Sequence, residues 1–164
     1  MVKLSPNVTY IDEFAYVAVK AGADAISAIN TIQALEIEPY TQKPVLGNLV
    51  GGMSGRAILP IAQRKIADIV LRLEEEKRKG NIKKVVPIVG VGGIHSGLDA
   101  VRFILLGCTA VQVGTAVKDD IFVFKKIAKE IEDYMKEMNY TSLDEFRGAA
   151  LKWIKEHQEQ RKEE

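Results

Sequence analysis

Four short apolar segments alternate along the chain with longer segments of helical periodicity. The apolar segments cover residues 2–5, 25–30, 85–90 and 109–113, and their lengths suit β-strands. The third reads VVPIVG and is apolar throughout, which is typical of a strand that is covered on both faces. Strands of this kind, each followed by a helix, predict a parallel α/β sheet whose crossovers are right-handed.

The segments between these strands carry helix start and stop signals. Gly22 follows one helical stripe, and Ser96 precedes another as a candidate N-cap. A long polar stretch between residues 33 and 48 has neither signal and contains two prolines, so it is predicted to be a loop. The predicted helices cover residues 12–21, about 58–80, 96–106, 119 or 120 to 138, and from 141 or 142 onward.

The composition restricts the class of protein. The 164 residues suffice for one domain with a real core, and the net charge of +1 gives no sign of a nucleic-acid partner. A single cysteine, Cys108, excludes an internal disulfide framework. No segment approaches the length of a membrane span, and the first residues lack signal-peptide features, so a cytoplasmic protein is expected.

Two glycine-containing segments follow the last two predicted strands. Gly92 and Gly93 follow one strand, and Gly114 and Thr115 follow the next. A glycine pair after a strand can simply be a tight turn. Glycines at the carboxyl ends of neighbouring parallel strands can instead direct several N–H groups at one phosphate, and Thr115 would add a hydroxyl donor. The repetition of the pattern on successive strands favours the phosphate interpretation.

Other polar residues at strand ends have two interpretations each. Lys3 could point into a ligand cleft or lie in water at the end of the chain. Asn30 and Thr31 end the second strand, where they suit either an amide-containing ligand or a turn. His95 is more simply a solvated loop residue, and Cys108 a small buried filler.

Several common functional motifs are absent from the sequence. No cluster of His, Cys, Asp or Glu has the spacing of a metal site. The sequence contains no nucleophile elbow and no P-loop. GVGGIHSG is not a dinucleotide-binding fingerprint, because it does not open the first strand–helix–strand unit.

Five segments in order resemble the class 1 dihydroorotate dehydrogenases, and the resemblance runs from residue 2 to about residue 150. The similarity is greatest to the type that works with a separate iron–sulfur flavoprotein subunit. The flavin domain of dihydropyrimidine dehydrogenases is similar but more distant. The matching segments read VKLSPNVTYI, GADAISAINT, KPVLGNLVGGMSGRAILPIA, PIVGVGGIHSGLDAVRFILLG and AVQVGTAV.

The resemblance implies roles for individual residues near a flavin ring. Lys3 matches a lysine beside the ring, where a cation stabilises the anionic N1–C2=O edge of the reduced flavin. Ile29 matches a position whose backbone touches FMN. Asn30 and Thr31 match the pair that binds the ring and carboxylate of dihydroorotate.

The resemblance also assigns the glycines. Gly55 matches a flavin-contacting glycine, although the family usually has Leu where this chain has Met53. Gly92 with Gly93, and Gly114 with Thr115, match the site of the FMN phosphate. The glycines indicated by the strand-end argument are therefore also indicated by the resemblance.

The implied fold is the C-terminal half, strands five to eight, of a TIM-type β/α barrel. Residues 1–156 are expected to form the FMN-binding half barrel, and residues 157–164 a charged, frayed tail. The implied activity is the FMN-dependent oxidation of dihydroorotate to orotate in pyrimidine biosynthesis. The family's catalytic base, a Cys or Ser, lies on the other half of the barrel, and Cys108 does not match it.

Three arrangements are compatible with this resemblance. A separate polypeptide could supply the N-terminal half and restore an enzyme, with the iron–sulfur flavoprotein subunit as a further partner. Two copies could pair into a barrel-like, non-catalytic dimer that binds flavin or phosphate. The chain could also be a truncated fragment that self-associates. In each arrangement the isolated chain is expected to be inactive.

Overall fold

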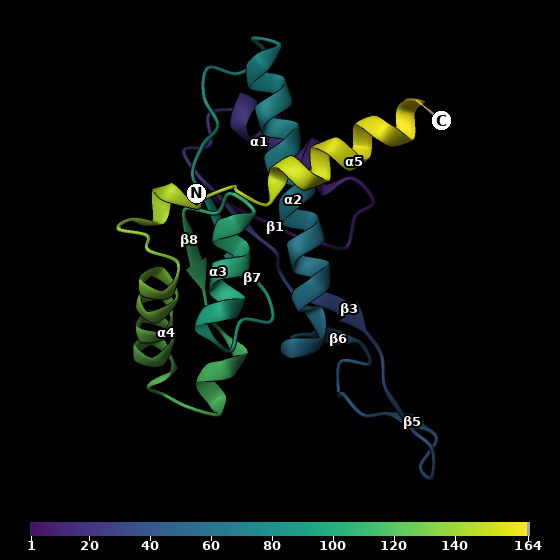
Figure 1. Cartoon of the computed structure of the whole chain (residues 1–164). Helices are drawn as coiled ribbons and strands as arrows, with labels where there is room; N and C mark the ends of the chain where they lie inside the picture. The colour runs from purple at the N-terminus through teal and green to yellow at the C-terminus, as the bar shows by residue number, and fades with distance from the viewer. Residues whose placement is uncertain (164) are drawn as a thin grey trace.

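The computed structural model describes residues 1–163, and at positions 158, 159 and 161–163 it describes the backbone only. A sheet of four parallel strands lies at its centre, in the order β1-β2-β7-β8 (Figure 1). These strands are β1 (Val2–Leu4), β2 (Ile26–Ala28), β7 (Ile88–Val91) and β8 (Ala110–Gln112). Strands that follow one another in this order are neighbours, so the predicted parallel α/β sheet is confirmed.

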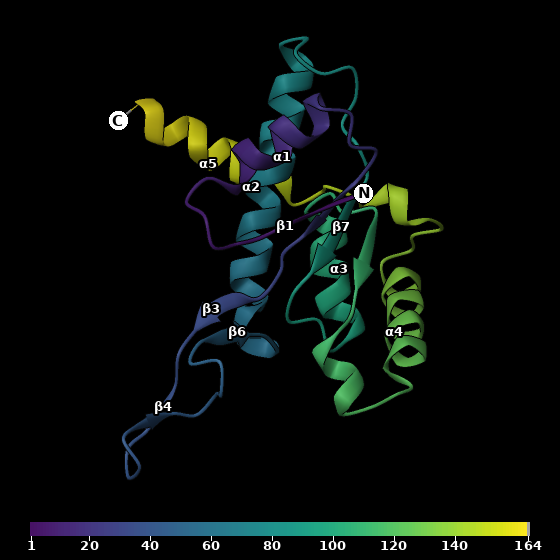
Figure 2. The same cartoon turned by 180° about the vertical axis from the view of Figure 1, so that it is seen from behind.

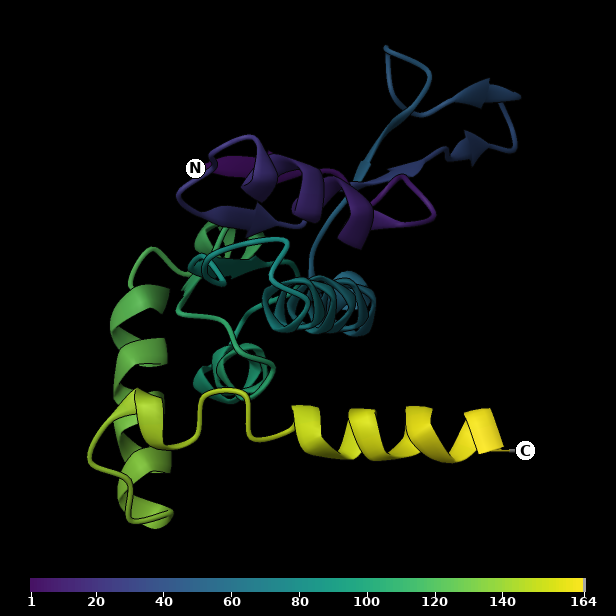
Figure 3. The ribbon, with the colours of Figure 1, turned by 90° about the horizontal axis from the view of Figure 1, so that it is seen from above.

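Helices connect the strands and cover one side of the sheet. Residues 1–163 contain five α-helices: α1 (Ile11–Lys20), α2 (Leu59–Arg78), α3 (Gly97–Leu105), α4 (Val123–Glu137) and α5 (Leu151–Glu163). The view from above shows α2 between α1 on one side and α3 on the other (Figure 3). The helices α1 to α4 lie side by side in this order around the sheet, as helices do in part of a β/α barrel.

The core lies between the sheet and these helices. Gly90 of β7 contacts α3 so closely that a Cβ there would lie 2.4 Å from the ring of Phe103. Burial of apolar side chains of this size is the main stabilising contribution in a domain of this length. Among the described residues, the largest completely buried apolar side chains are Phe103, Phe146, Ile11, Ile26, Ile29, Ile66, Ile69, Leu73 and Ile88.

The segment predicted to be a loop and the residues just after it form two short antiparallel ladders. One joins β3 (Ile32–Ala34) to β6 (Gly51–Met53), and the other joins β4 (Ile37–Glu38) to β5 (Lys43–Pro44). Together they form an arm that extends away from the parallel sheet (Figure 2). The prediction of a loop was wrong for these strands, because strands of two or three residues are too short to show an alternating pattern.

Two of the predicted helix starts also differ from the structure. Val123 begins α4 a few residues late, because the 3₁₀ turn Thr115–Lys118 precedes it. The last predicted helix is divided into the 3₁₀ turn Leu143–Glu145 and α5, and Gly148 lies between them at φ +77°. Glycine adopts this backbone conformation readily, so it interrupts the helix.

The domain limits stay a prediction. The helix α5 covers most of the predicted tail, and residue 164 lies outside the described residues. Among the helices of residues 1–163, none combines the length and hydrophobicity that a bilayer crossing requires.

Candidate functional site

A cavity of about 220 Å³ opens at the carboxyl ends of the four parallel strands. Its volume lies below the ~300–1,000 Å³ of typical small-molecule sites, as expected of one wall of a larger site. All nine residues predicted from the sequence line it, and they come from five separate segments of the chain. The lining residues are Lys3, Ile29, Asn30, Thr31, Ser54, Gly55, Ile58, Val91, Gly92, Gly93, Ile94, His95, Gln112, Gly114 and Thr115.

The glycine pair after β7 brings the backbone against the first turns of α2. Gly92 has φ +131° and Gly93 has φ +78°, a region that side-chain-bearing residues rarely adopt. A Cβ on Gly92 would lie 2.8 Å from Ala62 Cβ, and one on Gly93 would lie 2.7 Å from the Leu59 backbone. Both conformation and space therefore require glycine at these two positions.

The other two predicted glycines face open space. A Cβ on Gly114 would meet no atom within 4 Å, and one on Gly55 would meet only the Thr115 methyl group at 3.8 Å. Within residues 1–163, the N–H groups of Gly93, Ile94 and Gly114 donate to no protein acceptor. Free N–H donors beside an open space are what an oxygen-rich anion needs. This part of the cavity therefore fits the phosphate of a nucleotide-type cofactor.

A hydroxyl pair joins the loop after β8 to the segment before α2. The Thr115 Oγ1 hydroxyl donates to Ser54 Oγ at 2.8 Å. These residues are 61 positions apart in the sequence. Serine and threonine hydroxyls both donate and accept, so either can turn toward a bound anion. Ser54 lines the cavity, but the sequence argument did not identify it.

The asparagine and threonine after β2 are held by hydrogen bonds from a neighbouring loop. Asn30 Oδ1 accepts from the Thr31 N–H at 2.9 Å. The Asn7 carboxamide donates to the Thr31 carbonyl at 3.1 Å and accepts from the Gln33 N–H at 2.9 Å. Asn7 is a positioning residue that the sequence argument missed, although it lies within the matching segment VKLSPNVTYI.

Lys3 and Ile29 differ in their exposure to solvent. Lys3 is exposed on β1, whereas the Ile29 side chain is only 1% exposed. The backbone N–H of Ile29 donates to the Val91 carbonyl at 2.9 Å, which fixes this edge of the cavity. The cavity therefore combines a cation from β1 with a rigid backbone from β2.

The loop after Gly93 is held by a histidine and a carboxylate. His95 Nδ1 lies 3.0 Å from the Gly93 carbonyl oxygen, and because a carbonyl only accepts, Nδ1 carries the hydrogen. The Asp99 carboxylate accepts from the N–H groups of His95 and Ser96 at 3.0 and 3.1 Å. Ser96 and Asp99 also complete a capping box, which confirms the predicted N-cap of α3. His95 therefore has a structural contact as well as a place in the cavity wall.

Cys108 lies outside this cavity, and its thiol is buried. Burial raises the pKa of the Cys108 thiol to about 12. The thiolate is the reactive form, so the thiol is unsuited to act as a base or nucleophile near neutral pH.

This burial predicts slow alkylation of Cys108. At about pH 8, iodoacetamide is expected to modify the folded chain about a thousandfold more slowly than the urea-unfolded chain, because the thiolate fraction is that much smaller. Mass spectrometry of timed samples measures both rates. Comparable rates in the two states would show that the thiol is accessible and ionisable.

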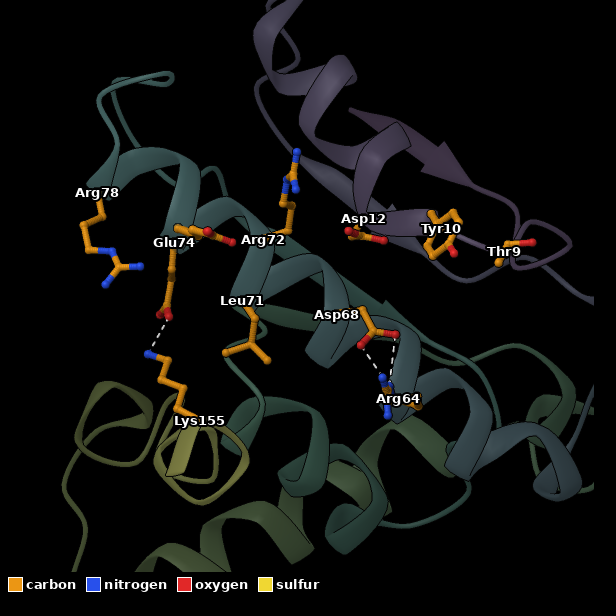
Figure 4. A pocket seen from close by; sticks show the side chains of 11 residues that line it. Thr9, Tyr10, Asp12, Arg64, Asp68, Leu71, Arg72, Glu74, Arg78 and Lys155 are labelled. Carbon is orange, nitrogen blue, oxygen red and sulfur yellow. Dashed lines mark hydrogen bonds and ion pairs between the residues drawn. The ribbon is translucent and has the colours of Figure 1, made fainter. Parts of the chain in front are cut away.

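A second, larger cavity lies between α1, α2 and α5 and has a volume of about 580 Å³ (Figure 4). Its charges largely neutralise one another: Arg64 pairs with Asp68 at 2.9 Å, and Lys155 with Glu74 at 2.8 Å. Its wall contains four acidic and four basic side chains and none of the predicted site residues. It has no excess charge for an ionic ligand, so we assign the functional site to the smaller cavity.

The described residues offer no metal site. Within residues 1–163, no group of three or more His, Cys, Asp or Glu side chains could hold a metal ion. The polar groups of the cavity are amides, hydroxyls, one imidazole and one ammonium. They suit an organic ligand with an anionic group.

Known proteins with related sequences give a consistent result. Residues 1–135 match the sequence model of the family described as "Dihydroorotate dehydrogenase". The dihydroorotate dehydrogenase B (NAD(+)) catalytic subunit of Pyrococcus abyssi is 44% identical over 92% of this chain and 47% of its own length. The equivalent subunit of Geobacter metallireducens is 41% identical over 91% of this chain and 45% of its own length.

A solved structure shows the same fold. The crystal structure of DHODH from Eimeria tenella in complex with ferulenol superposes with a TM-score of 0.67 and 24% sequence identity. The match covers 90% of this chain and 37% of that one. The chain spans about half the length of the curated relatives it matches. By its sequence over most of its length, the chain belongs to the dihydroorotate dehydrogenase family.

Proposed function

We propose that this chain forms the flavin-phosphate half of an FMN-dependent dihydroorotate dehydrogenase, which oxidises dihydroorotate to orotate in pyrimidine biosynthesis. One observation carries the proposal. Nine residues from five separated segments, each assigned by the resemblance to FMN or substrate, line a single cavity at the carboxyl ends of the strands. Ligands of β/α barrels bind at this end of the strands.

Some of the cavity-lining residues bind the FMN phosphate, and others bind the rings of the flavin and the substrate. Gly92, Gly93 and Gly114 offer backbone N–H groups to the FMN phosphate, and Thr115 offers a hydroxyl. A Cβ on Gly114 would project into the open space that the phosphate needs, which supports this assignment.

The ring-binding residues lie on the first two strands. Lys3 supplies a positive charge beside the flavin ring, and the Ile29 backbone supports that ring. Asn30 and Thr31 bind the ring and carboxylate of dihydroorotate, and Asn7 holds their loop in place.

The bound FMN would supply the redox chemistry by accepting the electrons that dihydroorotate loses. The chain's own residues bind and orient both molecules. Among the described residues that line the cavity, Ser54 is the only Cys or Ser, and it does not match the family's base; its hydroxyl accepts a hydrogen bond from Thr115. We therefore assign proton removal to the barrel half that carries strands one to four.

The names of the relatives support a partner subunit. The Pyrococcus abyssi and Geobacter metallireducens proteins are catalytic subunits of an NAD(+)-dependent enzyme. We propose that the assembled barrel likewise passes electrons to NAD(+) through an iron–sulfur flavoprotein subunit.

A second candidate function is a non-catalytic flavin- or phosphate-binding dimer of two copies. The observation that favours it is the state of the sheet edges: within residues 1–163, β1 and β8 each pair with a single strand. Unpaired edges are sites of association. In this case the cofactor binds, but no turnover follows from adding the other barrel half.

Co-production with the other barrel half tests the enzymatic proposal. The second polypeptide would carry strands one to four of a class 1 relative, including its Cys or Ser loop. Orotate formation from dihydroorotate is expected from the purified complex, and a Cys/Ser→Ala variant of the second polypeptide serves as the control. A stable complex that contains FMN but forms no orotate would contradict the enzymatic function and favour the dimer.

A further inference from the structure

We propose that Gln112 is a further cofactor-binding residue, whose side-chain N–H donates to a ring carbonyl of the flavin. Ser27 acts as its positioning residue. This inference rests on the proposed function, since it names one more contact in the same cavity.

Gln112 lies on the open face of the sheet. Successive side chains of a strand point to opposite faces, so Gln112 and Val111 lie on opposite faces of β8. Val111 packs against the core cluster, whereas Gln112 is exposed and lines the cavity together with Lys3. A glutamine inside an otherwise apolar strand, VQVGT, is the sequence signal that could have identified it.

A buried serine fixes the orientation of this carboxamide. Ser27 lies on β2, is 1% exposed, and donates its hydroxyl to Gln112 Oε1 at 3.1 Å. The bond spans the sheet across β7, since β2 and β8 are not neighbouring strands. Burying a hydroxyl group is costly unless the group makes a hydrogen bond. The bond to Gln112 satisfies the Ser27 hydroxyl and at the same time holds the Gln112 carboxamide in place.

The hydrogen bond to Ser27 decides what Gln112 can offer a ligand. Its carbonyl oxygen is engaged, and within residues 1–163 its Nε2 donors have no acceptor. Lys3 is the register partner of Ser27 on the neighbouring strand, whereas Lys3 on β1 and Gln112 on β8 come from opposite edges of the sheet. The free carboxamide N–H donors of Gln112 suit a carbonyl group of a pyrimidine ring. Flavin and orotate both contain this ring, and the position of Gln112 two residues before Gly114, which is assigned to the FMN phosphate, favours the flavin.

Nuclear magnetic resonance of the ¹⁵N-labelled 164-residue chain tests the contact directly. The side-chain NH₂ signals of Gln112 are identified as those lost in Gln112→Glu, which keeps the size but removes the donors. These signals are expected to shift on addition of riboflavin or FMN and to stay in place with inorganic phosphate. A shift with orotate but not with riboflavin would assign the contact to the substrate and overturn the flavin proposal.

Affinity measurements supply a second readout. Gln112→Glu and Gln112→Leu are expected to weaken the binding of riboflavin and of FMN by the same factor, about 3- to 10-fold. The factor is the same because both ligands contain the ring that Gln112 contacts. Ser27→Ala is expected to weaken the binding of both ligands by a smaller factor, since it removes the hydrogen bond that orients the Gln112 carboxamide but leaves the carboxamide itself. Gln63→Leu on α2, outside the cavity, is the matched control and should change neither affinity.

The outcomes separate this inference from the proposed function. If FMN shifts the backbone signals of Gly92, Gly93 and Gly114 while Gln112 is unaffected and its variants bind normally, the inference is wrong and the proposed function stands. If FMN shifts no signal from the cavity, both are wrong.

Discussion

Replacing Gly93 with alanine is expected to lower the free energy of unfolding by about 2–5 kcal/mol. The positive φ of +78° costs an alanine about 1–2 kcal/mol. The new Cβ would also lie 2.7 Å from the backbone of Leu59, and forcing atoms into packed surroundings costs a further ~1–3 kcal/mol. A typical domain is stable by only ~5–15 kcal/mol, so this change removes a large share. Urea unfolding followed by circular dichroism measures the loss.

Gly80→Ala is the matched control for this prediction. Gly80 has φ +77°, almost the same as Gly93, but a Cβ there would meet no atom within 4 Å. The difference between the two variants therefore isolates the close approach between the loop after β7 and α2. Equal losses of stability would mean that Gly93 is required by its conformation alone, and that the loop is not pressed against α2.

Replacing Lys3 with methionine is expected to reduce the rate of orotate formation by the assembled enzyme about 10²–10³-fold. Negative charge develops on the flavin ring as it accepts electrons, and a preorganised cation beside that ring is worth about this much in rate. The loss of the charge should also lower the midpoint potential of the bound flavin, where ~30 mV corresponds to 1.4 kcal/mol for two electrons. Stopped-flow kinetics and a redox titration measure the two effects.

Two variants control for the position and sign of this charge. Lys3→Arg keeps a cation at the site, so the midpoint potential of the bound flavin is expected to stay close to that of the unsubstituted protein. Lys20→Met removes an exposed cation at the end of α1, outside the cavity, and should leave both quantities unchanged. An unaltered potential in Lys3→Met would contradict the placement of Lys3 beside the flavin ring.

The sequence predicted the parallel sheet and the members of the cavity wall for a physical reason. Buried strands such as residues 85–90 are uniformly apolar, and glycines at strand ends are visible wherever the backbone must turn sharply or pack closely. Because the carboxyl ends of parallel strands meet at one edge of the sheet, a correct sheet order brings Gly92 and Gly114 together. Strand β7 begins three residues later than predicted, which changes neither result.

Features that depend on tertiary contacts could not be predicted. The arm from β3 to β6 consists of strands of two or three residues, and their pairing is decided by the turns between them. In α1 the buried side chains are Ile11 and Ala15, whereas Phe14 is 56% exposed. Hydrophobic spacing identifies such a helix but does not decide which of its apolar residues faces the core.

Polar positioning contacts were missed for a related reason. Asn7, Ser27 and Gln112 act through hydrogen bonds to residues 24 to 85 positions away in the sequence. A single polar residue in an apolar segment indicates that a partner exists but not which residue it is. The side-chain geometry is needed to connect Ser27 with Gln112.

The most direct test of the flavin-phosphate site compares the binding of FMN and riboflavin, which differ only in the phosphate. Isothermal titration calorimetry of the 164-residue chain is expected to give at least about tenfold tighter binding for FMN, because charge-assisted hydrogen bonds from the free N–H groups are worth ~1.5–3 kcal/mol each. Thr115→Val should reduce the difference between the two affinities without weakening the binding of riboflavin. Equal affinities for the two compounds would contradict the assignment of Gly92, Gly93, Gly114 and Thr115 to the phosphate.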